Sequence, residues 1–183
     1  MDAGTKFTVE GDSICWAGRA LAPANSVVVT NLYELRSLTA LDGVFRAALP
    51  HEIDMLFVAT VAELPVVVGV ESKKTEDLLN SWSSRRLHRQ LATIKATCDM
   101  GLLMIRSGWP LTNFWGDEPT ELYEDLVAWQ LLGNLVAPGP ALDSAVPHVI
   151  QRYRWLLEGQ LSPLRAVAGR EPPRRSRQGW YLE

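Results

Sequence analysis

A short run of branched apolar residues, ending in two charged ones, most constrains what this chain can fold into. Residues 66–70 read Val-Val-Val-Gly-Val, and Glu71-Ser72-Lys73 follow directly. An uninterrupted apolar run of this length predicts a strand buried on both faces. Side chains two residues apart share one face of a strand, so Glu71 and Lys73 should emerge side by side at its end. A carboxylate beside an ammonium at a sheet edge can hold a divalent metal and orient a water molecule.

A second carboxylate is expected from the neighbouring strand. Asp54 stands in the apolar segment 53–59, which predicts a strand shortly before the one that ends at Glu71. Asp followed by Glu-x-Lys at this spacing is the arrangement of metal-dependent phosphodiester cleavage. The alternative is that Glu71 and Lys73 form an ordinary ion pair at a strand end, because charged pairs are common at sheet edges.

The composition limits the class of protein. With 183 residues, 47% of them hydrophobic and 21% charged, the chain fits one soluble globular domain with a sizeable core. No apolar run reaches the roughly 18 residues needed to span a bilayer, and no apolar signal region follows the first residues. Cys15 and Cys98 lack the spacing of a zinc ribbon or a disulfide scaffold. We therefore expect a cytoplasmic protein without membrane contact.

Charge is distributed unevenly along the chain. The net charge is −3, yet residues 72–95 carry +4, which leaves −7 for the remainder. The basic residues of this segment are Lys73, Lys74, Arg85, Arg86, Arg89 and Lys95. A basic patch next to paired carboxylates attracts phosphates while the acids keep a metal, so the patch predicts a surface that faces DNA. The alternative is a solvated helix face.

Periodicity and turn residues predict a mixed α/β order of elements. The expected strands are a β-hairpin over 5–21 and segments 27–29, 53–59, 66–70 and 102–105. The expected helices are 35–49, which Pro50 closes, 75–82, which Thr75 caps, 85–99, 119–136, and a last helix from about 144 or 147 to 158. This order predicts an α/β fold in which helices flank a central mixed β-sheet.

One block of residues resembles a known family. Glu71-Ser72-Lys73-x-x-x-Asp77-Leu78-x-x-Ser81, followed by Arg86-Leu87-x-x-Gln90-Leu91, is similar to the ERCC4-type (XPF-like) nuclease domain of the PD-(D/E)xK superfamily. The likeness covers roughly residues 26–108. It implies a restriction-endonuclease-like core with extra C-terminal helices. It also implies a DNA endonuclease that depends on Mg²⁺ or Mn²⁺ and hydrolyses branched or junction DNA.

The resemblance also assigns roles. Asp54, Glu71 and the backbone carbonyl of Ser72 would hold the metal ion, Lys73 would orient the attacking water, and Glu34 would bind metal through water or hold a second ion. The residues expected to contact DNA are Lys74, Arg85, Arg86, Arg89, Gln90 and Lys95. Asp77 is expected to orient its helix, and His88 to be a surface histidine. The chain departs from the family at Asn31, Tyr33, Ser72 and Arg106.

The predicted organisation has four parts. Residues 1–25 form an N-terminal β-hairpin extension, 26–110 the nuclease core, 111–160 C-terminal helices that pack on the core or form a dimer interface, and 161–183 a basic tail. The resemblance implies a homodimer in the cytoplasm of a bacterium or a phage-infected host cell. A Holliday-junction resolvase or an exonuclease of the same superfamily is the alternative enzyme. The alternative from another class is a nuclease-like scaffold that binds DNA without catalysis.

Overall fold

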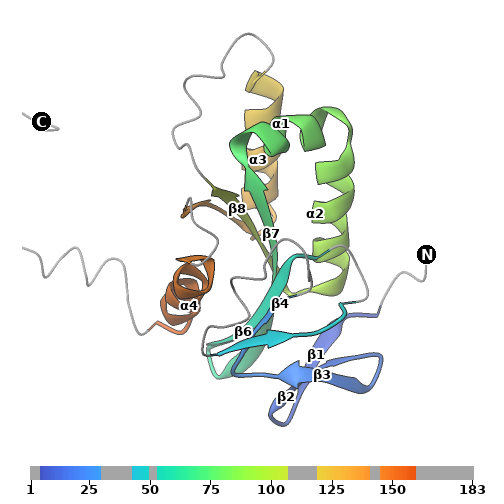
Figure 1. Cartoon of the computed structure of the whole chain (residues 1–183), viewed down its shortest axis with the longest axis vertical. Coiled ribbons are helices and arrows are strands. Elements are labelled where there is room, and N and C mark those ends of the chain that lie inside the picture. The colour runs from blue at the N-terminus through green and yellow to red at the C-terminus, as the bar shows by residue number, and fades with distance from the viewer. Residues whose placement is uncertain (1–4, 30–42, 50–52, 107–118, 141–144, 160–183) are drawn as a thin grey trace, which may run out of the picture.

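The computed structural model describes residues 5–29, 43–49, 53–106, 119–140 and 145–159, and within them the strands form two sheets. The smaller sheet is an antiparallel meander of β1 (Phe7–Glu10), β2 (Ser13–Trp16) and β3 (Arg19–Pro23). The larger sheet has six strands in the order β5-β4-β6-β7-β8-β9 (Figure 1). The predicted hairpin over 5–21 is therefore present, with a third strand added to it.

The strands of the larger sheet run in both directions. They are β4 (Val27–Val29), β5 (Val44–Arg46), β6 (Met55–Val61), β7 (Leu64–Lys74), β8 (Met100–Arg106) and β9 (Leu135–Gly139). A two-residue turn joins β6 and β7 into a hairpin, and both of its residues, Ala62 and Glu63, have positive φ, as a tight hairpin turn requires. β7, β8 and β9 are mutually parallel, so their carboxyl ends meet at one edge of the sheet.

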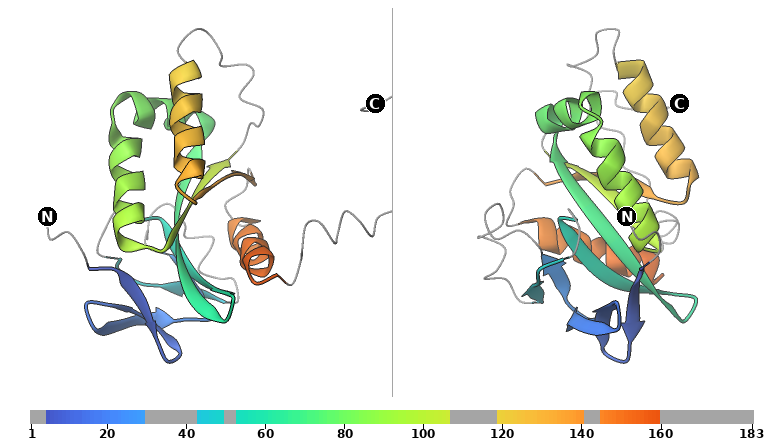
Figure 2. Two further views of the ribbon diagram at one scale, coloured as in Figure 1. Left: turned by 180° about the vertical axis from the view of Figure 1, so that it is seen from behind. Right: turned by 90° about the vertical axis from the view of Figure 1, so that its right-hand side faces the viewer.

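Helices make the parallel crossovers and cover both faces. α1 (Thr75–Ser83) and α2 (Arg86–Thr97) connect β7 to β8, and α3 (Pro119–Leu131) precedes β9. α1, α2 and α3 lie together on one side of the sheet, whereas α4 (Val146–Leu157) lies on the other (Figures 1 and 2). No helix of the described residues is long and apolar enough to cross a membrane.

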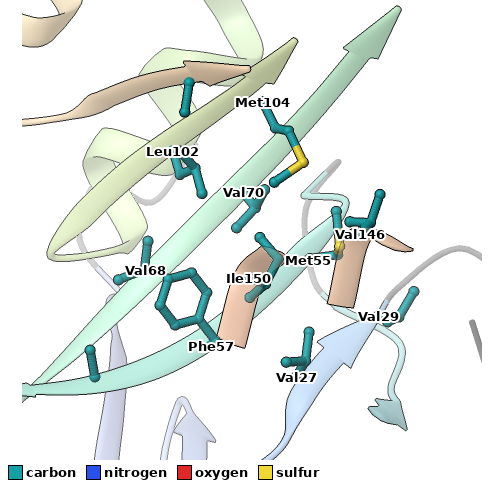
Figure 3. Packing of buried hydrophobic residues seen from close by; sticks show 12 residues of the cluster. Val27, Val29, Met55, Phe57, Val68, Val70, Leu102, Met104, Val146 and Ile150 are labelled. Carbon is teal, nitrogen blue, oxygen red and sulfur yellow. The ribbon is translucent and has the colours of Figure 1, made fainter. Parts of the chain in front are cut away.

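Alternation along the strands divides the core between the two faces. Val68, Val70 and Phe57 pack with Val146 and Ile150 of α4 (Figure 3). Residues on the opposite face of the sheet pack with the smaller sheet and with α2 and α3: Leu56, Val67, Phe7, Ile14, Ile94 and Trp129. Buried residues of α1, α2 and α3 complete this side around Leu103 and Ile105. The predicted fold, a central mixed sheet flanked by helices, is confirmed.

Three expected element boundaries are wrong. Phe45 belongs to strand β5, which pairs with β4, and not to a helix over 35–49; residues 30–42 of that prediction and Pro50 lie outside the described residues. Thr75 is the first helical residue of α1 and does not cap it, because the extended Lys74 precedes the helix. The helix expected over 119–136 ends at Leu131, since Gly133 has a φ of +83° and β9 follows.

Two glycines permit the helices to approach the sheet closely. A Cβ on Gly69 would lie 2.7 Å from Cys98 Sγ, and one on Gly101 would overlap the Trp129 ring and lie 3.0 Å from Ile94 Cγ2. These contacts bring α2 and α3 onto the strands that carry the predicted site. A methyl group at either glycine would force these buried side chains to shift.

We expect Gly101→Ala to lower the free energy of unfolding by about 1–3 kcal/mol, because the added methyl overpacks the contact with Trp129. Urea denaturation followed by circular dichroism would measure this loss. In a Trp129→Leu background, where the ring is gone, the same substitution should cost much less. Equal losses in the two backgrounds would contradict the assigned contact.

Candidate active site

The pairing of β6 with β7 brings the two predicted carboxylates together. Met55 pairs with Val70, so the next residues outward, Asp54 and Glu71, come opposite each other where the ladder ends. Asp54 Oδ2 accepts a hydrogen bond of 2.8 Å from the backbone N–H of Ser72. In an extended strand the N–H and C=O of one residue point to the same side, so the Ser72 carbonyl also faces the Asp54 side.

Glu71 and Lys73 share a buried face, as their spacing predicts. Glu71 is fully buried and Lys73 is 3% exposed. Lys73 Nζ lies 2.6 Å from Glu71 Oε1 and 3.7 Å from Asp77 Oδ2 in the first turn of α1. Asp77 was expected only to orient its helix, yet its carboxylate also contacts the lysine. The ammonium is thus held between a buried and a half-exposed carboxylate.

Burial disfavours the ionised form of the Glu71 carboxyl. Desolvation raises the pKa of its carboxyl from the usual 4.5 to about 8, and the negative charge of Asp54 adds to the rise. Lys73 and Arg86 act in the opposite direction without cancelling it. A further positive charge beside Asp54 and Glu71 would therefore lower this pKa strongly.

The donor set fits a hard divalent cation. Apart from the close contact of Oε1 with Lys73, neither buried oxygen of Glu71 has a hydrogen-bond donor among the described residues. Mg²⁺ is commonly bound by one or two carboxylates, with waters and substrate phosphate completing the shell. Asp54, Glu71 and the Ser72 carbonyl could supply such ligands. Within the described residues no group of three or more His, Cys, Asp or Glu gathers around a possible metal, and Glu34 lies outside them.

The residues predicted to contact DNA fall into two groups. Arg86, at the start of α2, is exposed and close enough to Glu71 to lower its pKa, and Gln90, one turn later, is buried with an unpaired Oε1. Lys74, Arg85 and Arg89 are also exposed. Lys95 does not join this site, because its Nζ donates to the carbonyl of Leu132 beyond α3. Of the residues predicted to contact DNA, Arg86 is therefore the one whose charge is seen to act on Glu71.

The departures from the family pattern differ in their location. Arg106, at the end of β8, lies opposite Lys74 of β7 in the register of the two strands. Leu103 and Ile105 face α1 and α2, whereas Leu102 and Met104 face α4, so alternation places Arg106 on the α4 side. Arg106 is therefore on the opposite face of the sheet from Glu71 and Lys73. Asn31 and Tyr33 lie outside the described residues.

Sequence reasoning missed one polar network, which joins α1 and α2 to α3. Asp125 Oδ2 lies 2.9 Å from His88 Nε2 and accepts a 2.7 Å hydrogen bond from Trp82 Nε1. These bonds lower the pKa of Asp125 below its usual range. His88 was expected to be a plain surface residue. Only the tertiary approach of α3 reveals its partner, since 37 residues separate the pair.

Without divalent metal, stability should fall as the pH rises from 4.5 to 8. In this range folded Glu71 keeps a proton that the unfolded chain has lost, which removes up to about 1.4 kcal/mol per pH unit. Urea unfolding in EDTA at a series of pH values would measure the slope. Glu71→Gln should flatten it, whereas Glu76→Gln, which alters an exposed carboxyl of α1, should not. An unchanged slope in Glu71→Gln would contradict the raised pKa.

Comparison with known proteins identifies the fold. No protein-family model and no curated protein sequence matches the chain. Among solved structures, XPF from Aeropyrum pernix aligns with a TM-score of 0.55 and 21% identity, over 77% of this chain and 69% of that one. The same protein in complex with DNA aligns with a TM-score of 0.56 and 20% identity, over 75% and 67%. The chain therefore has the fold of XPF, which the resemblance in its sequence predicted.

Proposed function

We propose that this protein is a metal-dependent DNA endonuclease that hydrolyses phosphodiester bonds in branched DNA. The observation that carries the proposal is the buried Glu71–Lys73 pair opposite Asp54, at the sheet edge where α2 begins with Arg86. The fold supports it, because the similar XPF of Aeropyrum pernix has also been solved in complex with DNA. DNA is accordingly the proposed partner, and Mg²⁺ or Mn²⁺ the proposed cofactor.

Each residue of the proposed site has a separate role. Asp54, Glu71 and the Ser72 carbonyl would hold the divalent cation, which when bound polarises the scissile phosphate and makes a bound water more acidic. Lys73 Nζ can donate a hydrogen bond to the attacking water or to the phosphate oxygens as negative charge develops there. Asp77 positions that ammonium from its second side. Arg86 and Gln90 share one face of α2 and would contact the DNA phosphates next to the cut.

A DNA-binding scaffold without catalysis is the second candidate. It is favoured by the small acid set, since among the described residues no group of three or more His, Cys, Asp or Glu side chains could hold a metal ion. A resolvase or an exonuclease would use the same site on another DNA structure. Association as a homodimer, in the cytoplasm of a bacterium or a phage-infected cell, completes the proposal.

Cleavage assays would test the enzyme directly. The labelled substrates are a four-way junction, a flap, a single strand and a linear duplex, each with Mg²⁺ or Mn²⁺. We expect Asp54→Asn, Glu71→Gln and Lys73→Ala each to slow cleavage by roughly a hundredfold or more, because each removes a group that acts on the developing charge. Glu76→Gln, an exposed change in the adjoining helix, serves as the matched control and should cleave normally.

The outcomes separate the candidates. Cleavage that survives Glu71→Gln would overturn the assigned active site. Absence of cleavage by the wild type, together with tight and metal-independent binding of the junction, would favour the scaffold. Preference for a free end would identify an exonuclease, and symmetric cuts in the four-way junction would identify a resolvase.

Arg86 offers a separate test of the DNA surface. Arg86→Ala should weaken DNA binding in Ca²⁺ and reduce the slope of log K against log salt by about one, because one phosphate contact is lost. Fluorescence anisotropy over a range of salt concentrations measures both effects. Arg19→Ala, which removes an exposed arginine from the smaller sheet, should leave the slope unchanged. An unchanged slope in Arg86→Ala would exclude this contact.

A further inference from the structure

An apolar groove of about 490 Å³ lies between α2 and α3, which are side by side in Figures 1 and 2. The buried side chains of Leu87, Leu126 and Trp129 line it. Ala92 and Ala96 also line it and are exposed, so the groove is open to solvent. Pockets that bind small organic groups have volumes of about 300–1,000 Å³. The groove therefore has the size and the access that one flat ring requires.

Two polar contacts between α2 and α3 show how the helices are aligned. His88 Nε2 lies 2.9 Å from Asp125 Oδ2 near one end of the groove, and Lys95 Nζ donates to the Leu132 carbonyl at 3.0 Å near the other. Both pairs are 37 residues apart in sequence. A constant offset over two helical turns means that α2 and α3 run in the same direction with their turns level.

One end of the groove adjoins the proposed active site. α2 begins at Arg86, whose positive charge acts on the Glu71 carboxyl. The next two residues, Leu87 and His88, line the groove. Since an α-helix with its side chains is about 10–12 Å in diameter, the groove and the buried carboxylate lie roughly that far apart, across one turn of α2.

Two tryptophans give the groove aromatic sides. Trp82, in the last turn of α1, lines the groove, and its Nε1–H donates a 2.7 Å hydrogen bond to Asp125 Oδ2, which fixes the ring. Trp129 is 6% exposed, and its buried Nε1–H has no acceptor among the described residues. A buried donor without an acceptor is rare and costly in folded proteins. A ring that enters beside Trp129 with an acceptor atom on its edge would satisfy this donor.

The two sides of the groove carry opposite charge. The charged residues of α3 are all acidic, whereas those of α2 are all basic, and Arg85 directly precedes them. Arg85 and Arg89 are exposed, and the charge of Arg85 acts on the Asp125 carboxylate at the near end of the groove. Phosphates would be attracted to α2 and repelled by α3. A nucleotide could therefore keep its phosphate on the α2 side and place only its uncharged base in the groove.

We propose that the groove binds one unpaired base of a DNA strand whose phosphates lie along Arg85 and Arg89. This inference rests on the proposed nuclease function and names the feature of branched DNA that the protein would recognise. The ring of the base would stack on an aromatic side chain of the groove, which every base can do because each has a π-face. An oxygen or nitrogen acceptor on the edge of the base would accept the N–H of Trp129.

The location of the groove decides which DNA it would select. In a paired duplex the bases are stacked and hydrogen bonded, so extruding one is costly, whereas a base at a bulge, flap or branch point is already free. With its base in the groove, the strand would pass within about one helix diameter of Glu71. The bound base would thus hold an unpaired stretch beside the carboxylates and direct cleavage to positions near a branch.

Three DNAs that differ at one nucleotide test the base site. They are a duplex with one bulged thymidine, the same duplex with an abasic bulge, and the fully paired duplex, and fluorescence anisotropy in Ca²⁺ measures their binding. The wild type should bind the bulged thymidine roughly tenfold more tightly than the abasic bulge, because the phosphates are the same and only the base is missing. The offset of 37 places Ala92 level with Trp129, so Ala92→Leu should abolish the difference by filling the groove. Gln130→Leu, an exposed change on α3 outside the groove, should keep it.

The N–H of Trp129 has a test of its own. Difluorotoluene has the shape of thymine, but its fluorine atoms are much weaker acceptors. The wild type should bind a bulged thymidine roughly fivefold more tightly than a bulged difluorotoluene nucleotide. Trp129→Phe, which keeps an aromatic ring and lacks the N–H, should bind the two alike. Circular dichroism would confirm that each variant folds.

Several results would overturn the base site. One is equal binding of the bulged thymidine and the abasic bulge by the wild type, and another is a difference that Ala92→Leu leaves unchanged. Free thymidine monophosphate that binds as tightly as the bulged DNA would show that the groove takes a free nucleotide instead. The cleavage test of Glu71 is separate, so the base site can fail in a protein that cleaves DNA. Loss of binding to all three DNAs would contradict the proposed nuclease as well.

Discussion

The arrangement around Glu71 depends on the burial of a carboxylate whose lost hydration is only partly replaced by interactions within the protein. Burying a charged group is costly unless it is paired and hydrogen bonded. Glu71 is fully buried, yet its close partners are one ammonium, from Lys73, and a second carboxylate, from Asp54, which raises the cost further. Such a site gains free energy from an added cation, and the fold keeps it only because many apolar contacts stabilise the strands that carry it.

The topology of the sheet explains why these groups meet. β7 runs parallel to β8 and antiparallel to β6, so the end of β7 adjoins the start of β6, and Asp54 comes beside Glu71. Gly69 and Gly101 then bring α2 close enough to exclude water from that face of β7. The chemistry of the site and the packing of the core therefore depend on the same two strands and the same helix.

Much of this could be predicted where the determining interactions are local. The apolar run before Glu71, the Glu-x-Lys spacing and the helix over 85–99 each depend on neighbours in sequence, and the structure has them close to the expected positions. The errors occur where the pairing partners are distant in sequence. Phe45 follows a helical period, yet it lies in the edge strand β5, which pairs with β4. Likewise, Lys95 shares the charge of its neighbours but lies on the stripe that faces α3, which charge counting could not reveal.

α2 has three faces with different tasks within twelve residues. Leu87 and Ile94 are buried in the core, Arg86 lies close enough to Glu71 to lower its pKa, and Ala92 and Ala96 line an apolar groove between α2 and α3. Arg89 is exposed and stands between the last two faces. Together with the exposed Lys74 and Arg86, it places three positive charges close to one another in the segment that follows Glu71. Charges grouped in this way would attract the phosphate backbone of a nucleic acid to the side of the molecule that carries the buried carboxylate.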